Sequence, residues 1–424
     1  MKLKIQTIQK MKILKLLVLC SIFISSIQFS QWMPQTSGTT GTVSGITCFS
    51  SLPVVVSVAG SKIYKTTNSG TNWLNIAYPL PENSLSDAVI SGPTTVWATG
   101  NALVLKSTNS GTNWVKMTVP NRFWNTAYFL NDNIGWVCGS TDTVIKTTNG
   151  GTNWTVQENN IYSNSGNYGI QFTNALIGYM CGFDAATNKG YILKTINGGG
   201  LWAEQFSTSD AVQCLAFINN NTGFSASSGK IFRTTNGGVN WIETSIAGTG
   251  AFYALNFPVN EQLGYAGGIG GKLYKTTNAG VNWYQITSGT TNHIRAIDFN
   301  FNSNTTGYAA GNSGTILYTT NGGGSFVGLI NTSEEIPGES GINYNYPNPF
   351  NPQTNINFKV AETGFVTVSI FNMLGEKIEE LIQSELKPGT YNVSWDATGK
   401  PSGIYFCKMT GSGFTDTKKL MLVK

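Results

Sequence analysis

The sequence predicts an all-β protein, in which a closed ring of seven four-stranded sheets is followed by a small β-sandwich. Three observations support this prediction. A nonapeptide, KTTNSGTNW at residues 65–73, returns in seven variants along the chain. Short apolar runs bounded by polar turns fill the intervals between the copies, as strands do. Almost no segment has the 3.6-residue periodicity of an amphipathic helix.

The spacing of the nonapeptide gives the size of the repeating unit. The tryptophan that closes each copy returns after 41, 40, 48 and 39 residues and then after 42, with an aromatic residue a further 43 on. A period of this size is that of one four-stranded blade of a β-propeller. The residues concerned are Trp73, Trp114, Trp154, Trp202, Trp241 and Trp283, with Phe326 in the seventh place.

Each repeat has the same order of predicted strands. A first strand ends in a large apolar residue, a second begins at an aromatic residue beside small ones, as in GWVCG, and a third reads like KIYKTT. The fourth strand begins at the tryptophan. The residues that end the first strands are Phe49, Ile90, Phe129, Phe172, Phe217, Phe257 and Phe299.

The nonapeptide spans the hairpin between the third and fourth strands of each blade. The side chain of Asn68 can accept hydrogen bonds from backbone N–H groups, and Gly70 can adopt the positive φ that closes the turn. Trp73 supplies a large ring to fill the wedge between blades. We therefore predict a structural role for every copy. The other asparagine and glycine positions are Asn109, Gly111, Asn149, Gly151, Asn197, Gly199, Asn236, Gly238, Asn278, Gly280, Asn321 and Gly323.

This pattern resembles the Asp-box (BNR-like) repeat, with asparagine in place of aspartate in all seven copies. Residues 31–326 as a whole resemble the photosystem II stability and assembly factor family of seven-bladed β-propellers. The resemblance implies a protein-binding scaffold without catalysis. It lies in the repeat and assigns no functional patch.

The start of the predicted ring repeats a piece of its end. QWMPQTSGTTG at residues 31–41 is similar to NWYQITSGTTN at residues 282–292, which is a fourth strand. Because this strand has no third strand before it, we expect the segment around Trp32 to complete the seventh blade. Such a closure removes the exposed edges of an open array of sheets.

Residues 1–30 are typical of a secretory signal peptide, with five lysines before the apolar run LLVLCSIFISSI. Their removal leaves 21 basic and 21 acidic residues, so the charge balance gives no reason to expect a nucleic-acid partner. The run is too short to span a membrane, and no later segment qualifies. We expect no transmembrane segment in the mature chain.

The C-terminal part of the chain is predicted to be a second domain. Residues 327–341, which include NTSEEIPGES, indicate a linker, and residues 342–424 indicate a β-sandwich, although EKIEELIQSEL has a spacing that also allows a short helix. YPNPFNPQT, FNMLGEKI and KKLMLVK resemble the C-terminal sorting domain of the type IX secretion system. The resemblance implies that residues 342–424 engage that machinery and that the protein is secreted or held at the cell surface.

Two functions remain open for the ring. We expect a non-catalytic module that binds an unknown protein or glycan through loops at one end, with a glycoside hydrolase that uses two carboxylates as the alternative. Asp184 and Asp210 flank the hairpin of the longest repeat, where a solvated loop position is expected. Three arginines are too few for a sialidase site. We assign no catalytic residue and no cofactor, and because His293 is the only histidine we assign no metal ligand.

Two further residue sets have structural interpretations. Cys138 and Cys181 occupy positions where other repeats have Thr or Ala, so we expect them to be small buried residues. A basic residue begins each of the six nonapeptides that end in tryptophan. These residues either form an anion-binding ring or, as we favour, cover apolar surface with their stems while their tips reach water. These are Lys65, Lys106, Lys146, Lys194, Arg233 and Lys275.

Overall fold

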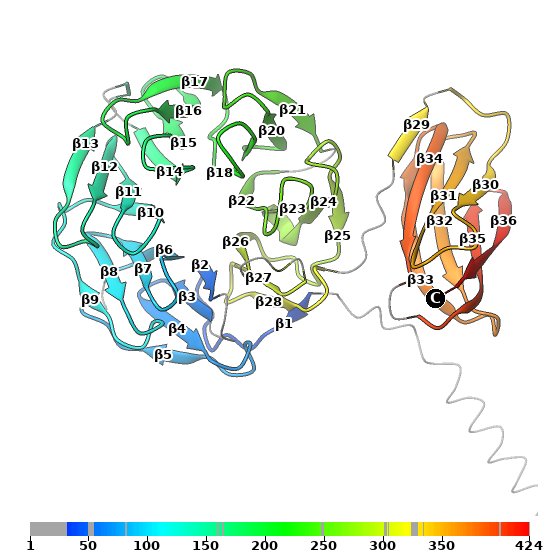
Figure 1. Cartoon of the computed structure of the whole chain (residues 1–424), viewed down its shortest axis with the longest axis horizontal. Helices are drawn as coiled ribbons and strands as arrows, with labels where there is room; N and C mark the ends of the chain where they lie inside the picture. Colours follow the sequence, from blue (N-terminus) through cyan, green and yellow to red (C-terminus); the bar gives the residue numbers. More distant parts are fainter. Residues whose placement is uncertain are drawn as a thin grey trace, which may run out of the picture.

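A computed structural model shows an all-β chain with a ring of sheets and a separate sandwich (Figure 1), each of which is described by itself. The structure describes residues 32–49, 55–80, 83–158, 161–162, 165–246, 250–300, 303, 305–323, 330–333, 335–397 and 400–423. The predicted signal at residues 1–30 and the seventh-place Phe326 lie outside these ranges. Within them, no helical segment has the length and hydropathy of a transmembrane span.

The ring is a seven-bladed β-propeller. In every blade four antiparallel strands run in order from the centre of the ring outward (Figure 1). Blades one to three are β2 (Val43–Cys48), β3 (Val55–Ala59), β4 (Lys62–Thr66) and β5 (Leu74–Ile76); β6 (Leu85–Ile90), β7 (Val96–Gly100), β8 (Leu103–Ser107) and β9 (Val115–Lys116); and β10 (Trp124–Phe129), β11 (Gly135–Gly139), β12 (Thr143–Thr147) and β13 (Thr155–Glu158).

Blades four to six follow the same order. They are β14 (Ser165–Phe172), β15 (Gly178–Asp184), β16 (Lys189–Thr195) and β17 (Ala203–Thr208); β18 (Cys214–Phe217), β19 (Gly223–Ala226), β20 (Lys230–Thr234) and β21 (Ile242–Ser245); and β22 (Phe252–Asn256), β23 (Gly264–Gly268), β24 (Leu273–Thr276) and β25 (Tyr284–Ile286). A 3₁₀ turn, η1 (Ile269–Gly271), lies between β23 and β24.

The seventh blade confirms the predicted closure. Its strands are β26 (Ile294–Phe299), β27 (Gly307–Gly311), β28 (Ile316–Thr319) and, as the outer strand, β1 (Met33–Pro34) from the front of the chain. Met33 pairs with Tyr318 and Pro34 with Leu317 in antiparallel register. The last sheet is therefore completed by a strand from the other end of the domain.

Glycine opens the second strand in five blades because an aromatic ring of the first strand lies against it. A Cβ atom on Gly178 would stand 2.4 Å from the ring of Phe172, and one on Gly135 would stand 2.1 Å from that of Phe129. The aromatic residue that follows the glycine then stacks on the first-strand ring of the next blade, as Trp136 does on Phe172 with centroids 3.5 Å apart. The GW and GY dipeptides of the repeat thus bring adjacent sheets into contact.

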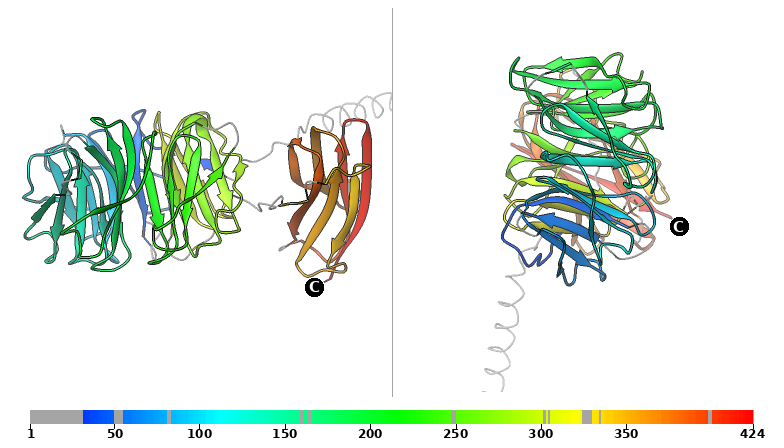
Figure 2. Two further views of the ribbon diagram at one scale, coloured as in Figure 1. Left: turned by 90° about the horizontal axis from the view of Figure 1, so that it is seen from above. Right: turned by 90° about the vertical axis from the view of Figure 1, so that its left-hand side faces the viewer.

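The C-terminal domain is a two-sheet sandwich (Figure 2). One sheet has the order β29 (Ile330–Ser333), β34 (Gly389–Asp396), β31 (Gln353–Val360) and β30 (Gly341–Tyr346). The other has the order β33 (Lys377–Leu386), β32 (Gly364–Phe371), β35 (Gly403–Gly411) and β36 (Phe414–Leu422). Its core includes Trp395, which is fully buried between the sheets.

Two segments of this region differ from the sequence expectations. EKIEELIQSEL is no helix, because Lys377–Leu386 pairs with β32 along its length, with two register shifts that accommodate its uneven apolar spacing. The expected linker contains a strand, since β29 pairs with β34. Pairing with an available sheet edge outweighs the local propensity of both segments.

Candidate functional site

Six of the nonapeptides form one repeated hairpin, and the described part of the seventh, through Gly323, forms the same turn. In blade three, Thr147 Oγ1 accepts a hydrogen bond from Gly151 N (2.8 Å), and Asn149 Oδ1 accepts one from Asn153 N (2.9 Å). Gly151 has a φ of 82°. The same bond from a glycine N–H to a Thr or Ser hydroxyl recurs at Gly70, Gly111, Gly199, Gly238, Gly280 and Gly323.

The tryptophans fill the crevices between blades. Trp154 stands edge-on to Trp97 of the preceding blade (6.1 Å) and to Phe129 of its own (6.4 Å). The seventh crevice is filled by Trp32, which is fully buried and edge-on to Tyr265 and Phe299 at 6.4 and 6.0 Å. The front strand therefore brings the indole that the last copy of the repeat lacks.

The repeated lysines are bonded to the next blade rather than arranged as a free anion-binding ring, and Lys65 and Lys275 are buried, so the favoured interpretation with tips in water was wrong for these two. Each of four ammonium groups donates to a hairpin carbonyl of the next blade and lies over an aromatic ring of its own, as Lys146 does to Gly198 O (3.1 Å) and over Trp136 (5.1 Å). Burial lowers the pKa of Lys275 to about 8. The others bonded in this way are Lys106, Lys194 and Lys275.

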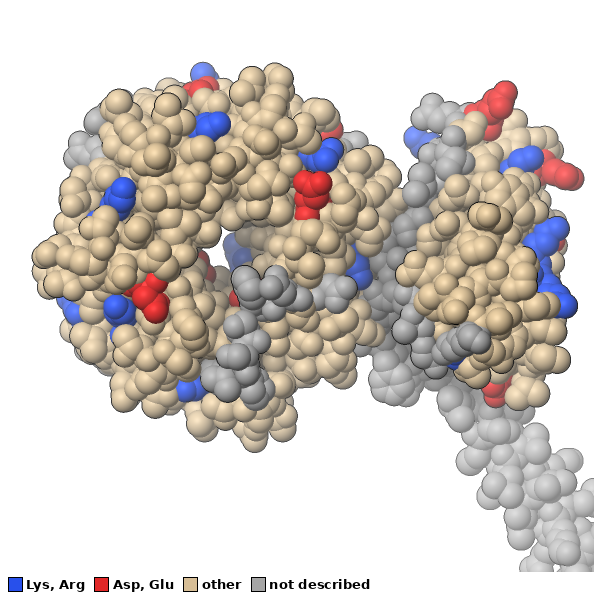
Figure 3. Space-filling model, in the orientation of Figure 1, with Lys and Arg blue, Asp and Glu red and all other residues tan. Residues whose placement is uncertain are grey.

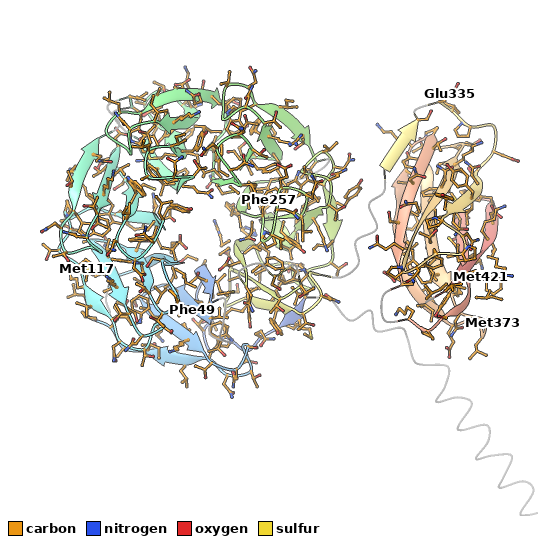
Figure 4. The ribbon with its side chains drawn as sticks, in the orientation of Figure 1. Phe49, Met117, Phe257, Glu335, Met373 and Met421 are labelled. Atoms are coloured by element: carbon orange, nitrogen blue, oxygen red, sulfur yellow. The ribbon has the colours of Figure 1, made fainter. Side chains whose placement is uncertain are left out.

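A cavity of ≈ 980 Å³ occupies the centre of the ring. Figure 3 shows it as a hollow with both basic and acidic atoms near its rim. The first strands of all seven blades line it, and Phe49 and Phe257, labelled in Figure 4, lie at the ends of two of these strands. The cavity is a candidate site, and its size is that of a small-ligand pocket.

A β-bulge at the first strand of each blade coincides with one residue that lines this cavity. The pairing with the second strand skips a residue at the same point in six blades, and in blade five Gln213 N donates to the already paired Ala226 O. Bulges are over-represented next to functional sites. We call the seven lining residues the bulge ring: Ser44, Ser86, Asn125, Tyr168, Gln213, Tyr253 and Arg295.

Sequence analysis missed the bulge ring. Six members stand four residues before the last residue of their first-strand pattern, as Tyr168 does before Phe172, and Ser44 stands five residues before Phe49. That fixed offset was available in the sequence. These positions vary from blade to blade, so repetition of residue type does not mark them.

Arg295 is the one basic side chain that lines the described cavity wall. Its Nε donates to Asn312 Oδ1 (3.1 Å), and its guanidinium carbon lies 4.1 Å from the ring centroid of Tyr253. His293 also contacts Tyr253, with centroids 6.2 Å apart, and its Nδ1 accepts from Gly270 N. The guanidinium is therefore held in a fixed orientation beside an aromatic face.

Two carboxylates also line the cavity, but both support the strands. Asp87 accepts hydrogen bonds from Ala88 N (2.8 Å) and Thr126 Oγ1 (2.5 Å). Asp298 accepts from Cys48 N (2.8 Å) and Phe299 N (3.0 Å). Burial raises the pKa of both to about 6.

The acidic residues singled out from the longest repeat do not border the cavity. Asp184 is 1% exposed rather than solvated, because its carboxylate caps the turn by accepting from the backbone N–H and hydroxyl of Thr187. Asp210 is half-buried and lies outside the cavity lining. In the same blade Tyr162 donates to the exposed Glu204.

The thiols have the expected structural character. Cys138 and Cys181 are fully buried, and burial raises the pKa of both thiols. No disulfide joins the cysteines of the described residues. In the same ranges, no group of three or more His, Cys, Asp or Glu side chains is placed to hold a metal ion.

Comparisons with known proteins agree with both domain types. Residues 345–424 match the family model of the secretion system C-terminal sorting domain. Such a type IX tail implies export, followed by secretion or attachment at the outer surface. A sequence search of curated proteins found no match.

Two solved structures similar to the ring are propellers named YCF48. One is YCF48 from Cyanidioschyzon merolae, with a TM-score of 0.57 and 19% identity over 68% of this chain and 98% of that chain. The other is YCF48 bound to D1 peptide, with a TM-score of 0.58 and 16% identity over 69% of this chain and 96% of that chain. At these identities the likeness shows the fold alone, and it agrees with the assembly-factor resemblance of the sequence.

Proposed function

We propose that the propeller is a non-catalytic binding module that acts outside the cell and holds a protein or glycan ligand in its central cavity. The observation that carries this proposal is the bulge ring. Seven equivalent positions line one cavity and carry five different residue types, whereas the hairpins of the same blades are nearly identical. Variation at equivalent positions is what a ligand site on a repeated scaffold requires.

Export is the second part of the proposal. In it, residues 1–30 are a signal peptide for the inner membrane, residues 31–326 are the cargo, and residues 342–424 engage the type IX machinery. The family match at residues 345–424 supports the last step. The similar propeller YCF48 bound to D1 peptide is an example of a ring of this shape that binds a polypeptide.

Hydrolysis is the less favoured alternative. A glycosidase that uses two carboxylates needs an acid and a base that face the substrate. Asp87 and Asp298 are the carboxylates of the cavity wall, and the oxygens of both accept hydrogen bonds from the strands. This arrangement suits a structural role for both carboxylates rather than the roles of a catalytic acid and base.

Filling the cavity tests the proposal. Ser86→Trp places an indole in the bulge ring, where it should occupy the space that a ligand needs and reduce binding at least about tenfold. The measurement is a binding screen of the mature protein against panels of glycans and cell-surface proteins. Leu74→Trp is the matched control, because Leu74 is 61% exposed on the outer strand β5.

Two results would contradict the proposal. One is equal binding by Ser86→Trp and Leu74→Trp when both variants melt at the temperature of the wild type. The other is hydrolysis of a glycan that disappears in Asp87→Asn or Asp298→Asn, which would make the protein an enzyme.

A further inference from the structure

The bulge ring is divided into a small half and a large half. Ser44, Ser86 and Asn125 come from the first three blades, and Tyr168, Gln213, Tyr253 and Arg295 come from the last four. Small residues leave room on one side of the cavity, and long residues supply contacts from the other. A ligand therefore meets mainly the wall formed by blades four to seven.

Arg295 presents an anion-binding group on that wall. Its Nε is used by Asn312 and its flat face by Tyr253, so the two terminal nitrogens are the part left to meet a ligand. A planar guanidinium binds a carboxylate through two parallel hydrogen bonds. No acidic side chain forms an ion pair with Arg295 within the described ranges.

The two carboxylates of the cavity wall are engaged by other groups and do not form an ion pair with Arg295. Asp298 lies three residues further along β26, which is about 10 Å at the rise of a β-strand. Its oxygens accept two backbone N–H groups, which point their positive ends at it. Asp87 lies on β6, beyond the intervening strand β2 of blade one, and is engaged by Thr126.

The rest of the wall is suited to hydroxyl groups. Tyr168 is 37% exposed, and neither Tyr168 nor Gln213 makes a side-chain hydrogen bond with another described residue. A primary amide offers two donors and an acceptor, and a tyrosine offers a flat face with a polar end. No member of the bulge ring is aliphatic, although aliphatic residues such as Val89, Leu215 and Leu255 line other parts of the cavity.

The strands also oppose the usual way of binding an extended peptide, in which it adds to a sheet edge. Side chains of the adjacent blade occupy inner edges at several points. Gln171 donates to Phe217 O (2.8 Å) and accepts from Phe217 N (2.7 Å), and Asp298 accepts from Cys48 N. Backbone groups that are already bonded cannot pair with a new strand.

We infer that the cavity binds an acidic polysaccharide, with the carboxylate of a hexuronate held by the terminal nitrogens of Arg295 and sugar hydroxyls held by Gln213 and Tyr168. The inference rests on the proposed function, because it names the ligand class of the same cavity. The cavity volume of ≈ 980 Å³ accommodates a short run of sugar units. Asn312 positions Arg295 and does not contact the ligand.

The test uses the full mature protein and three anionic probes: polygalacturonate, alginate and hyaluronate. We expect at least one to bind, and Arg295→Gln to weaken that binding at least about tenfold. Arg295→Lys keeps the charge without the planar fork and should weaken it by an intermediate factor. Arg122→Gln is the matched control, because Arg122 is exposed and lies outside the cavity lining, so its affinity should stay within about twofold.

Methyl esterification of the carboxylates gives a readout that a merely structural role of Arg295 would not change. The wild type should lose affinity for the esterified polymer, whereas Arg295→Gln should bind the free and esterified forms equally. Equal wild-type binding of both forms overturns the carboxylate inference and leaves the proposed function standing. Polyglutamate binding that depends on Arg295, in place of the sugars, overturns the ligand class.

Absence of binding to all three probes also overturns the inference. If the wider panels still yield a ligand that Ser86→Trp excludes, the proposed function survives that result. If they yield none, both fail. Thermal unfolding of each variant shows whether a loss of binding is a loss of folding.

Discussion

The two ends of each blade differ in whether the same residue types recur in all seven blades. At the hairpin end, the same threonine or serine, asparagine and glycine build the same turn in all seven blades. At the bulge end, the backbone irregularity repeats but the side chain does not. Residues that repeat in every blade thus serve the shared geometry of the blades, and positions whose residue type varies are those available to a ligand.

The comparison also explains why the seventh blade differs. Its own nonapeptide is YTTNGGGSF, without lysine or tryptophan. Tyr318 takes the place of the lysine and packs on Tyr308 with centroids 4.8 Å apart, and Trp32 from the front strand takes the place of the indole. The seventh crevice is still filled by an aromatic side chain, but this side chain comes from another part of the chain.

Removal of the closing indole should have the largest effect. Trp32→Ala deletes a fully buried side chain between Tyr265 and Phe299, and truncations of large aromatic residues in a core cost about 3–5 kcal/mol. We expect a loss of this size in the free energy of unfolding, measured by urea denaturation. Met33→Ala, on the same strand but 44% exposed, should change it by less than about 1 kcal/mol. Equal losses would contradict the closure by Trp32.

The cavity carboxylates should make stability depend on pH. The folded-state pKa of Asp87 is raised from 3.8 to about 6, so folding favours its protonated form. The contribution of this pKa shift to the free energy of unfolding is fully present below about pH 4 and is lost as the pH rises through 6. It totals about 3 kcal/mol. Asp87→Asn removes this titration, while its amide can accept from Ala88 N and donate to Thr126 Oγ1.

Urea denaturation at a series of pH values checks this prediction. Between pH 4 and pH 8 the wild type should lose stability relative to Asp87→Asn. A difference between the two proteins that stays constant over this range would show that Asp87 has an ordinary pKa and is not desolvated by the strands around it.

The fold was largely predictable because its causes are local and repeated. Asn149 encodes a turn through its side-chain oxygen and Gly151 through its positive φ, and seven spaced copies define the blades. The similarity of residues 31–41 to a fourth strand was enough to predict the closure by β1. The strand Lys377–Leu386 was harder to predict, because its pairing partners lie elsewhere in the chain.

The candidate site was not predicted, for a physical reason. A bulge depends on how two strands twist and pair, and no single residue encodes it. Tyr168 and Arg295 stand at equivalent positions yet share no chemistry, so residue type does not link them. The surroundings of Lys146 and Asp184 were also not predictable, because they depend on neighbouring groups. Lys146 donates to a hairpin carbonyl of the next blade, and Asp184 accepts from the hydroxyl and N–H of Thr187.

The most direct test of the account measures stability and ligand affinity together in two variants, Asn149→Ala in a hairpin and Arg295→Gln in the bulge ring. We predict that Asn149→Ala lowers the free energy of unfolding by about 1 kcal/mol, since it frees one N–H, and leaves affinity for the bound polysaccharide unchanged. Arg295→Gln should lower affinity at least about tenfold with unfolding within about 0.5 kcal/mol of the wild type. Loss of affinity in the hairpin variant, with affinity retained in the arginine variant, would contradict the division between structural and binding ends.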